Sequence, residues 1–286
     1  MTALVLSAAR RPVDFIIVLD WRGRLSAAFL LLMILTGLAA PLIAPYSPTD
    51  QDLVNMLMPA TAEHPLGTDD LGRDVLSRLI FGTGASLYAS FLAVTVATLI
   101  GVPIGLAAGF FSGWLDEVIS RVIDALLSFP GIVLAIGVTG ALGIGLTNAM
   151  VAVGIVFSPM VARLARARTL IVRSELYIDA ARCFGSSSAH VLRRHVLPNI
   201  LQSLLVQMTL LLASALLAEA SLSFLGIGVQ APDPSWGAML ARGYSYMEIA
   251  PEQMYPPGFA ILLTALAFNV LGESLRVALD PALKAR

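Results

Sequence analysis

The sequence predicts an all-α membrane protein with about six transmembrane helices. Three observations support this fold class: 57% of the 286 residues are hydrophobic, only 13% are charged, and the apolar residues occur in long runs. A soluble domain carries about a quarter charged residues, whereas a run of about 20 apolar residues can cross a bilayer as a helix. The expected spans are Leu25–Tyr46, Leu87–Phe110, Val118–Leu142, Thr147–Leu164, Leu201–Gly226 and Phe259–Val277.

The first span follows four arginines and could be mistaken for a signal peptide. Its length, and the five apolar runs after it, favour a retained transmembrane helix. The basic residues then set the orientation, because cytoplasmic loops carry the excess of lysine and arginine. If the N-terminus is cytoplasmic, 15 of the 18 basic residues lie inside, and only Arg73, Arg78 and Arg242 lie outside. We therefore predict that both termini are cytoplasmic.

Two segments on the predicted outer side are long enough to contact another molecule. Residues 47–83 contain three prolines, and residues 227–257 contain five prolines together with Trp236 and three tyrosines. Proline keeps such segments out of long helices, and the aromatic residues suit a membrane–water interface. Each loop either contacts a partner that delivers solute or lies on the lipid headgroups.

The chain divides into two parts by this interpretation. Residues 1–83 hold the N-terminal cytoplasmic segment, the first transmembrane helix and the first outer loop. Residues 84–286 form a core of five transmembrane helices with a cytoplasmic segment at 165–198.

The composition argues against several kinds of chemistry. Cys183 is the only cysteine and the three histidines are scattered, so neither an internal disulfide nor a zinc motif is expected. The only lysine, Lys284, has no glycine-rich loop beside it, so the chain lacks a P-loop for ATP. An intramembrane enzyme would need a G-x-S-x-G nucleophile, zinc ligands or paired aspartates within the spans. We expect no catalytic residue, metal site or cofactor in this chain, and no nucleic-acid partner.

The stretch between the fourth and fifth spans, residues 163–198, carries the main functional signal. Ser174 can cap the start of a helix, with Glu175 near its positive end. Small side chains at Ala180 and Ala181 let another surface approach closely. The stretch is also rich in arginine, as expected on the cytoplasmic side.

A turn and a second short helix are expected next. Gly185 can end the first helix and turn the chain, and Ser186–Ser188 can start another helix before Pro198 marks the entry to the fifth span. The whole stretch therefore predicts two short helices on the inner face of the membrane. Their shape is suited to docking into a groove of another protein.

This stretch resembles the E-A-A-x3-G-x9-I-x-L-P signature of permease subunits in binding-protein-dependent ABC importers. The nine-residue spacing is intact, and two positions differ: Asp179 replaces the glutamate, and His195 replaces an aliphatic residue. The Arg-His-x-Leu-Pro-Asn form that begins at Arg194 is similar to the peptide and nickel branch. The matching positions are Ala180, Ala181, Gly185, Leu197 and Pro198.

Three further motifs resemble the "C" subunit of dipeptide and oligopeptide permeases. They are GTDDLGRDVLSR at 67–78, SLSFLGIG at 221–228 and PSWG at 234–237. The resemblance implies a multi-pass permease subunit of the bacterial plasma (inner) membrane that takes part in importing di- or oligopeptides. Nickel, glutathione or another small solute is the alternative within the branch. A secondary transporter is a more distant alternative, because no convincing inverted repeat is present.

The resemblance also implies the partners: a different second permease subunit, two ATPase subunits that bind ATP and Mg, an extracytoplasmic solute-binding protein, and lipid. The cytoplasmic helix of each permease would insert into a cleft on an ATPase, so that ATP-driven closure moves the spans as rigid bodies. The alternative is an ordinary amphipathic surface helix. The implied coupling residues are Asp179, Ala180, Ala181, Arg182, Gly185, Ser186, Ser187 and His190.

Polar residues inside the spans are candidates for the translocation path, because burying a charge in lipid costs about 3 kcal/mol or more. Glu219 in the fifth span and Asn269 in the sixth are the candidates. Glu219 can instead hydrogen-bond a neighbouring helix, and we favour that role. Glycines in the second and third spans suit close helix packing rather than a ligand site; they are Gly101, Gly105, Gly109, Gly131 and Gly137.

Overall fold

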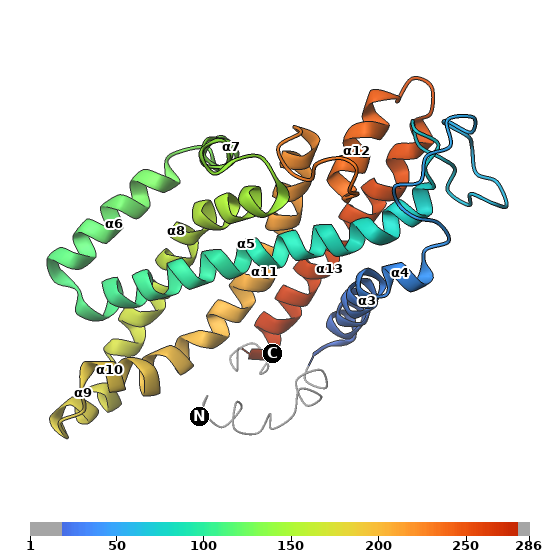
Figure 1. Cartoon of the computed structure of the whole chain (residues 1–286). Helices are drawn as coiled ribbons and strands as arrows, with labels where there is room; N and C mark the ends of the chain where they lie inside the picture. The colour runs from blue at the N-terminus through green and yellow to red at the C-terminus, as the bar shows by residue number, and fades with distance from the viewer. Residues whose placement is uncertain (1–18, 280–286) are drawn as a thin grey trace.

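A computed structural model describes residues 19–279 as an elongated bundle of helices (Figure 1). Within that range no strand forms, and two residues make one isolated bridge. The α-helices are α3 (Trp21–Leu38), α4 (Ala40–Ile43), α5 (Val75–Phe111), α6 (Gly113–Leu127), α7 (Gly131–Leu142), α8 (Leu146–Arg173), α9 (Leu176–Cys183), α10 (Ser188–Val191), α11 (Leu197–Phe224), α12 (Trp236–Ser245) and α13 (Tyr255–Leu279). A π-helical turn, Leu192–Val196, joins α10 to α11, and a 3₁₀ turn, Pro251–Met254, precedes α13.

The prediction of about six spans is confirmed. Among the described residues, five helical stretches are long and apolar enough to cross a membrane, or six if one bent pair is a single span. The five are α3, α5, α8, the continuous stretch Ser188–Phe224, and the stretch Pro251–Leu279. Each of them exposes large apolar side chains, such as Leu31 on α3, Leu99 on α5 and Leu262 on α13, as a lipid-facing surface requires.

The third expected span, Val118–Leu142, is not one straight helix. The helices α6 and α7 meet at an angle of 96°. Pro130 lies in the break, and a proline disfavours the helical conformation of the residue before it. The bend leaves α6 apart from the core of the bundle, and an ion pair with α8 attaches it: Arg166 Nη2 lies 2.7 Å from Asp116 Oδ2.

The centre of the bundle is the packing of α5 against α8 and α11. A side chain at Gly105 would place its Cβ 2.3 Å from the Ala162 carbonyl oxygen, and Gly101 and Gly109 face α8 equally closely. These three glycines have the packing role that was predicted from the sequence. The same prediction is wrong for Gly137, where an added Cβ would meet no described atom within 4 Å, and Gly131 has only an ordinary contact.

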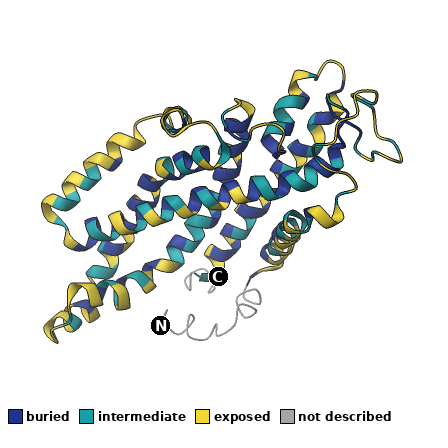
Figure 2. Ribbon diagram, viewed as in Figure 1, coloured by how far each residue is buried: buried dark blue, intermediate teal, exposed yellow. Residues whose placement is uncertain are grey.

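The two ends of the bundle carry different structures. Residues 44–74 and α12 lie at one end, called here the loop end, and α9 and α10 lie at the other, the α9 end (Figure 1). At the loop end α5 begins at Val75 rather than near Leu87, because Asp74 caps it by accepting a hydrogen bond from Ser77 N at 2.7 Å. Figure 2 shows that α3, α6 and the α9 end are the most exposed parts.

Candidate functional site

The α9 end forms the two short helices that the sequence predicts, with one difference at the start. Ser174 does not cap the beginning of α9. It ends α8, where its hydroxyl donates to the Ile171 carbonyl at 2.8 Å. Glu175 occupies the position before α9 and makes no side-chain cap. The expected cap is wrong because α8 continues about two turns beyond the predicted end of the fourth span. The Ser174 hydroxyl therefore bonds to a carbonyl group in the last turn of α8, where the backbone carbonyls have no helical partner.

Gly185 forms the turn between the two helices. Its φ is +82°, a left-handed conformation that glycine adopts without strain. Two backbone hydrogen bonds close the turn: Gly185 N donates to Arg182 O at 2.9 Å, and Ser186 N donates to Ala181 O at 3.0 Å. Ser187 then caps α10 by accepting from His190 N at 3.3 Å. Residues within the segment thus form both the turn and the second cap. The helix α9, the turn at Gly185 and the helix α10 (residues 176–191) are called the hairpin below.

The tip of the hairpin is exposed. Of the eight residues predicted for coupling, six are exposed, and only Ala181 and Ser186 are partly covered. Two apolar side chains that the sequence analysis did not select stand out on the same tip. Leu176 is 84% exposed and Phe184 is 90% exposed. The sequence could have indicated them, because both are large apolar residues in a predicted cytoplasmic segment, close to Ala180 and Gly185. Exposed apolar residues of this kind often mark a protein-binding surface.

Three contacts join the base of the hairpin to the bundle. Ile178 is fully buried. The Arg182 guanidinium lies 5.1 Å from the centroid of the Phe110 ring at the end of α5. Tyr177 Oη accepts a hydrogen bond from Asn199 Nδ2 on α11 at 3.2 Å. These contacts join α9 directly to α5 and α11, so a displacement of α9 would also move or strain both of those helices.

The Tyr177 phenol is suited to this contact at neutral pH. Partial burial, followed by the nearby Glu175 carboxylate, raises the pKa of Tyr177 above its ordinary value. The phenol is protonated at neutral pH, and its oxygen accepts from Asn199 Nδ2. Asp179, by contrast, is exposed and makes no ion pair with any described residue.

Glu219 lies inside the bundle rather than on an open surface. It is fully buried, and its two carboxylate oxygens accept from Ser223 Oγ at 2.7 Å and from Ser86 Oγ at 3.2 Å. Ser86 Oγ in turn accepts from the Trp236 backbone N at 3.2 Å. This geometry joins α5, α11 and the start of α12, and corresponds to the hydrogen-bonding role rather than to path lining.

Asn269, the second candidate for the path, lies on the exposed side of α13. Its Nδ2 donates to the Ala265 carbonyl of its own helix at 3.0 Å. It makes no hydrogen bond to Glu219 and does not line the hollow of about 540 Å³ that opens between α8, α11 and α13. The structure therefore does not bring the two path candidates together.

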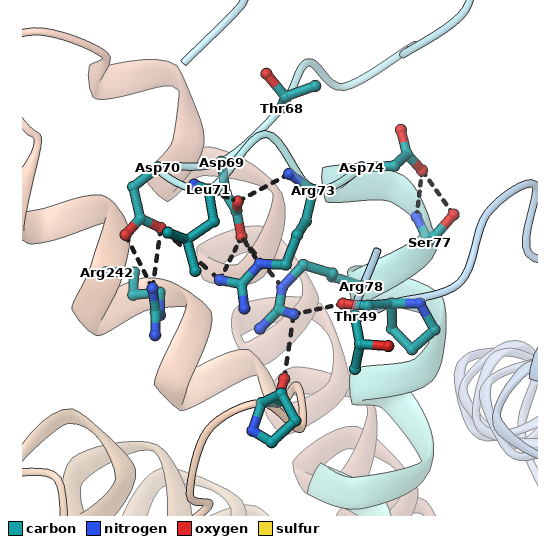
Figure 3. A network of polar contacts seen from close by, with 12 residues as sticks. Thr49, Thr68, Asp69, Asp70, Leu71, Arg73, Asp74, Ser77, Arg78 and Arg242 are labelled. Carbon is teal, nitrogen blue, oxygen red and sulfur yellow. Dashed lines mark hydrogen bonds and ion pairs between the residues drawn. The ribbon is translucent and has the colours of Figure 1, made fainter. Parts of the chain in front are cut away.

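A polar network organises the loop end (Figure 3). Asp69 lies at its centre: its Oδ2 accepts from Arg73 Nε at 2.7 Å and lies 3.4 Å from Arg78 Nε. Arg242 on α12 donates to Asp70 Oδ2 at 2.9 Å. Asp69, Arg73 and Arg78 are nearly fully buried, and buried charges are tolerated when they are paired and hydrogen-bonded in this way.

The network connects segments that are far apart in the sequence. Arg78 Nη1 donates to the Pro48 carbonyl at 2.6 Å and to the Pro232 carbonyl at 3.3 Å. The loop before α5 is thus fixed both to α5 and to the loop before α12. The motif at 67–78 therefore has a structural role, because its charged residues hold the two loops of this end together.

Comparison with known structures shows the class of fold. One chain of the MetNI methionine ABC transporter, in an inward-facing conformation, superimposes with a TM-score of 0.59. The alignment covers 70% of this chain and 96% of that chain at 21% identity. The helices are therefore arranged as in a membrane subunit of an ABC transporter.

Sequence comparison shows the family. Residues 101–285 match the family described as binding-protein-dependent transport system inner membrane component, and residues 22–60 match the N-terminal TM domain of oligopeptide transport permease C. The chain belongs to this family of inner membrane components and falls in its peptide and nickel branch.

Two relatives place the chain within the branch. The dipeptide transport system permease protein DppC of Alkalihalophilus pseudofirmus is 42% identical over 88% of this chain and 83% of its own length. The glutathione transport system permease protein GsiD of Shigella flexneri is 45% identical over 91% of this chain and 86% of its own length.

Proposed function

We propose that this chain is the permease subunit of an ABC importer that carries short peptides across the bacterial inner membrane. Family membership supports the role of permease, and the two relatives described above are named for a dipeptide and for glutathione, which is itself a short peptide. Glutathione is the second candidate solute, because the relative named for it is 45% identical. Nickel or another small solute is the remaining alternative.

The hairpin at the α9 end is the proposed coupling element, and its exposed tip is the observation that carries this proposal. Leu176 and Phe184 would be costly to leave in water at about 25 cal/mol per Å² of apolar area. An apolar cleft on an ATPase subunit would bury them. Asp179, Ala180, Ala181, Arg182, Gly185, Ser186, Ser187 and His190 complete the docking surface.

The remaining partners and the orientation follow from the same proposal. A second, different permease subunit completes the path, and two ATPase subunits bind ATP and Mg beneath the pair. A solute-binding protein delivers peptide to the loop end, which faces away from the cytoplasm. The chain has no P-loop, so the ATP is hydrolysed by the separate ATPase subunits, and the proposal gives this chain a non-catalytic role without a cofactor.

The domain division is part of the proposal. Residues 1–83 would add one helix and an outer loop to the permease core at 84–286. The first part of the predicted N-terminal segment, residues 1–18, lies outside the described residues.

The assembly is tested by isolating the tagged chain from its native membrane in mild detergent and identifying co-purified proteins by mass spectrometry. We expect P-loop ATPases and a second permease of similar size. A matched chain with Leu176→Ser and Phe184→Ser should lose the ATPases and keep the second permease. Recovery of this chain alone, under conditions that preserve other membrane complexes, would contradict the proposal.

The solute is tested by reconstituting the purified assembly with its binding protein and measuring ATP-dependent uptake of a labelled dipeptide, glutathione and nickel. We expect uptake of the dipeptide or glutathione. Uptake of nickel alone would contradict the peptide assignment.

A further inference from the structure

A hollow of about 540 Å³ opens between α8, α11 and α13 near the α9 end. Its wall on α11 carries Asn199, Ser203 and Gln207, at intervals of four residues, together with Gln202. Because residues four apart share one face of a helix, these side chains form a polar row along α11.

The polar row extends deep into the bundle. Gln207 lies about 15 Å along the helix from Leu197 at a rise of about 1.5 Å per residue. A bilayer has a hydrocarbon core about 30 Å thick, so this amide reaches close to the middle of the membrane. The hollow ends beyond it at Leu210, whose side chain packs against Gly272 on α13.

Asn199 Nδ2 donates to Tyr177 Oη at 3.2 Å and to the His195 carbonyl at 2.6 Å, but the deeper side chains of the row lack such partners. Gln202 and Ser203 make no side-chain hydrogen bond to any residue the structure describes, and Gln207 Nε2 reaches only Met160 Sδ at 3.5 Å, a weak acceptor. An amide without partners in hydrocarbon is costly. By contrast, Leu262, Leu263 and Leu266 are exposed on α13 at similar depth, and the exposed Asn269 there donates to the Ala265 carbonyl of its own helix.

The composition of the row indicates what fills the hollow. Amides and hydroxyls both donate and accept hydrogen bonds, as water and the peptide main chain also do. The row itself has no charge, and the charged residues Arg168 and Arg276 line the hollow nearer the α9 end. Pockets of about 300–1,000 Å³ hold small organic ligands, so the volume suits part of a short peptide.

We propose that this hollow is a water-filled chamber of the translocation path, open to the cytoplasm, in which Asn199, Ser203 and Gln207 hydrogen-bond to the main chain of a passing peptide. The inference rests on the proposed function, including its orientation. Neutral hydrogen-bonding groups let peptides of different sequence pass, because they contact the part that all peptides share. The chamber adds a lining for the inner half of the path, and neither Glu219 nor Asn269, the two candidates from the sequence, lines it.

The chamber is tested by the reactivity of single introduced cysteines in the assembled importer. The variants are Ser203→Cys, Gln207→Cys and the control Leu266→Cys, which lies about 20 Å from Leu279 along α13. Inside-out vesicles are treated with a charged, membrane-impermeant methanethiosulfonate, and modification is read by peptide mass spectrometry. The native Cys183 lies on the hairpin proposed to dock on an ATPase, so its modification is counted separately from that of the introduced cysteines.

We expect Cys at 203 and 207 to react at least ten times faster than Cys at 266, and more slowly when a transported peptide is present in excess. A rate at 207 as slow as the rate at 266 would overturn the proposal, since it would indicate a dry permease–permease interface. Reaction with a membrane-permeant maleimide alone would also overturn it, since the hollow would then hold lipid.

Peptide uptake by the unmodified assembly separates the two proposals. Uptake without labelling of the chamber positions would leave the proposed function standing and reject the chamber. Labelling without uptake of any peptide would reject the peptide assignment and, with it, the main-chain contacts.

Discussion

Gly185 illustrates how one residue can determine the proposed docking surface. An added Cβ would meet no described atom within 4 Å, so space does not require glycine there. The backbone does, because its φ is +82°. A left-handed conformation costs roughly 1–2 kcal/mol for an ordinary L-residue and less for asparagine.

We therefore predict different effects for two substitutions at this position. Gly185→Val should lower the equilibrium constant for forming the native turn about five- to thirtyfold, the factor that roughly 1–2 kcal/mol represents. Membrane insertion should be unchanged, while peptide uptake per ATP hydrolysed should fall. Gly185→Asn should retain more of the coupling than Gly185→Val. Reconstituted vesicles with uptake and ATPase activity measured together provide the check, and normal coupling in Gly185→Val would contradict the role of the turn.

The role of Glu219 is decided by the residues around it. A carboxylate in an apolar helix is a candidate for function by its cost alone. Here Ser86 and Ser223 supply hydrogen bonds, and Trp236 extends the contact to α12. The residue therefore holds three helices together. This role depends on distant partners, because Ser86 and Glu219 are 133 positions apart in the sequence.

At the scale of the elements, the contact between α5 and α8 depends on missing side chains. Gly101, Gly105 and Gly109 lie at intervals of four residues and let the two backbones approach. Van der Waals packing of this kind is the main attraction between helices in lipid, where the hydrophobic effect gives no preference for helix–helix contact. The packing also connects the loop end, where α5 begins, to the α9 end.

We predict that Gly105→Ala destabilises the protein by about 1–3 kcal/mol, the usual cost of overpacking, because the added Cβ would lie 2.3 Å from the Ala162 carbonyl oxygen. Gly137→Ala is the matched control on α7, where no described atom is close. It should be neutral or stabilising by up to about 1 kcal/mol through helix propensity. Thermal unfolding of both variants in detergent gives the comparison, and equal midpoints would argue against the close packing.

At the scale of the whole molecule, the two ends differ in what they expose and in how firmly they are held. Buried ion pairs fix the loops before α5 and α12 into one body (Figure 3). The opposite end carries the exposed hairpin, joined to α5 and α11 at its base. A rigid loop end and a projecting α9 end suit a protein that receives solute on one side and docks a motor on the other.

Sidedness is the prediction that belongs to this scale. In intact cells, an impermeant thiol reagent should modify Val54→Cys, which replaces a side chain that is 92% exposed at the loop end, and should not modify Cys183. In inside-out vesicles stripped of the ATPase subunits, which are proposed to cover the hairpin, the order should reverse. Modification of Cys183 in intact cells would contradict the cytoplasmic placement of the α9 end.

The sequence alone was sufficient for the features that depend on local composition. Apolar runs predicted the spans because hydrophobic length is a property of each segment. The hairpin was predicted because its turn depends on Gly185 and its second cap on Ser187, both within the segment itself. The P-loop could be ruled out by the single lysine.

Only the tertiary structure decided the features that depend on packing between distant segments. It divided the third span at Pro130, surrounded Glu219 with serines from two helices, and paired Asp70 with Arg242 across the loop end. It also assembled the polar hollow from three helices, although its row of amides on α11 already had a helical spacing in the sequence. Hydropathy measures how far a segment avoids water, but which polar groups meet inside the bundle is decided by the relative placement of the helices.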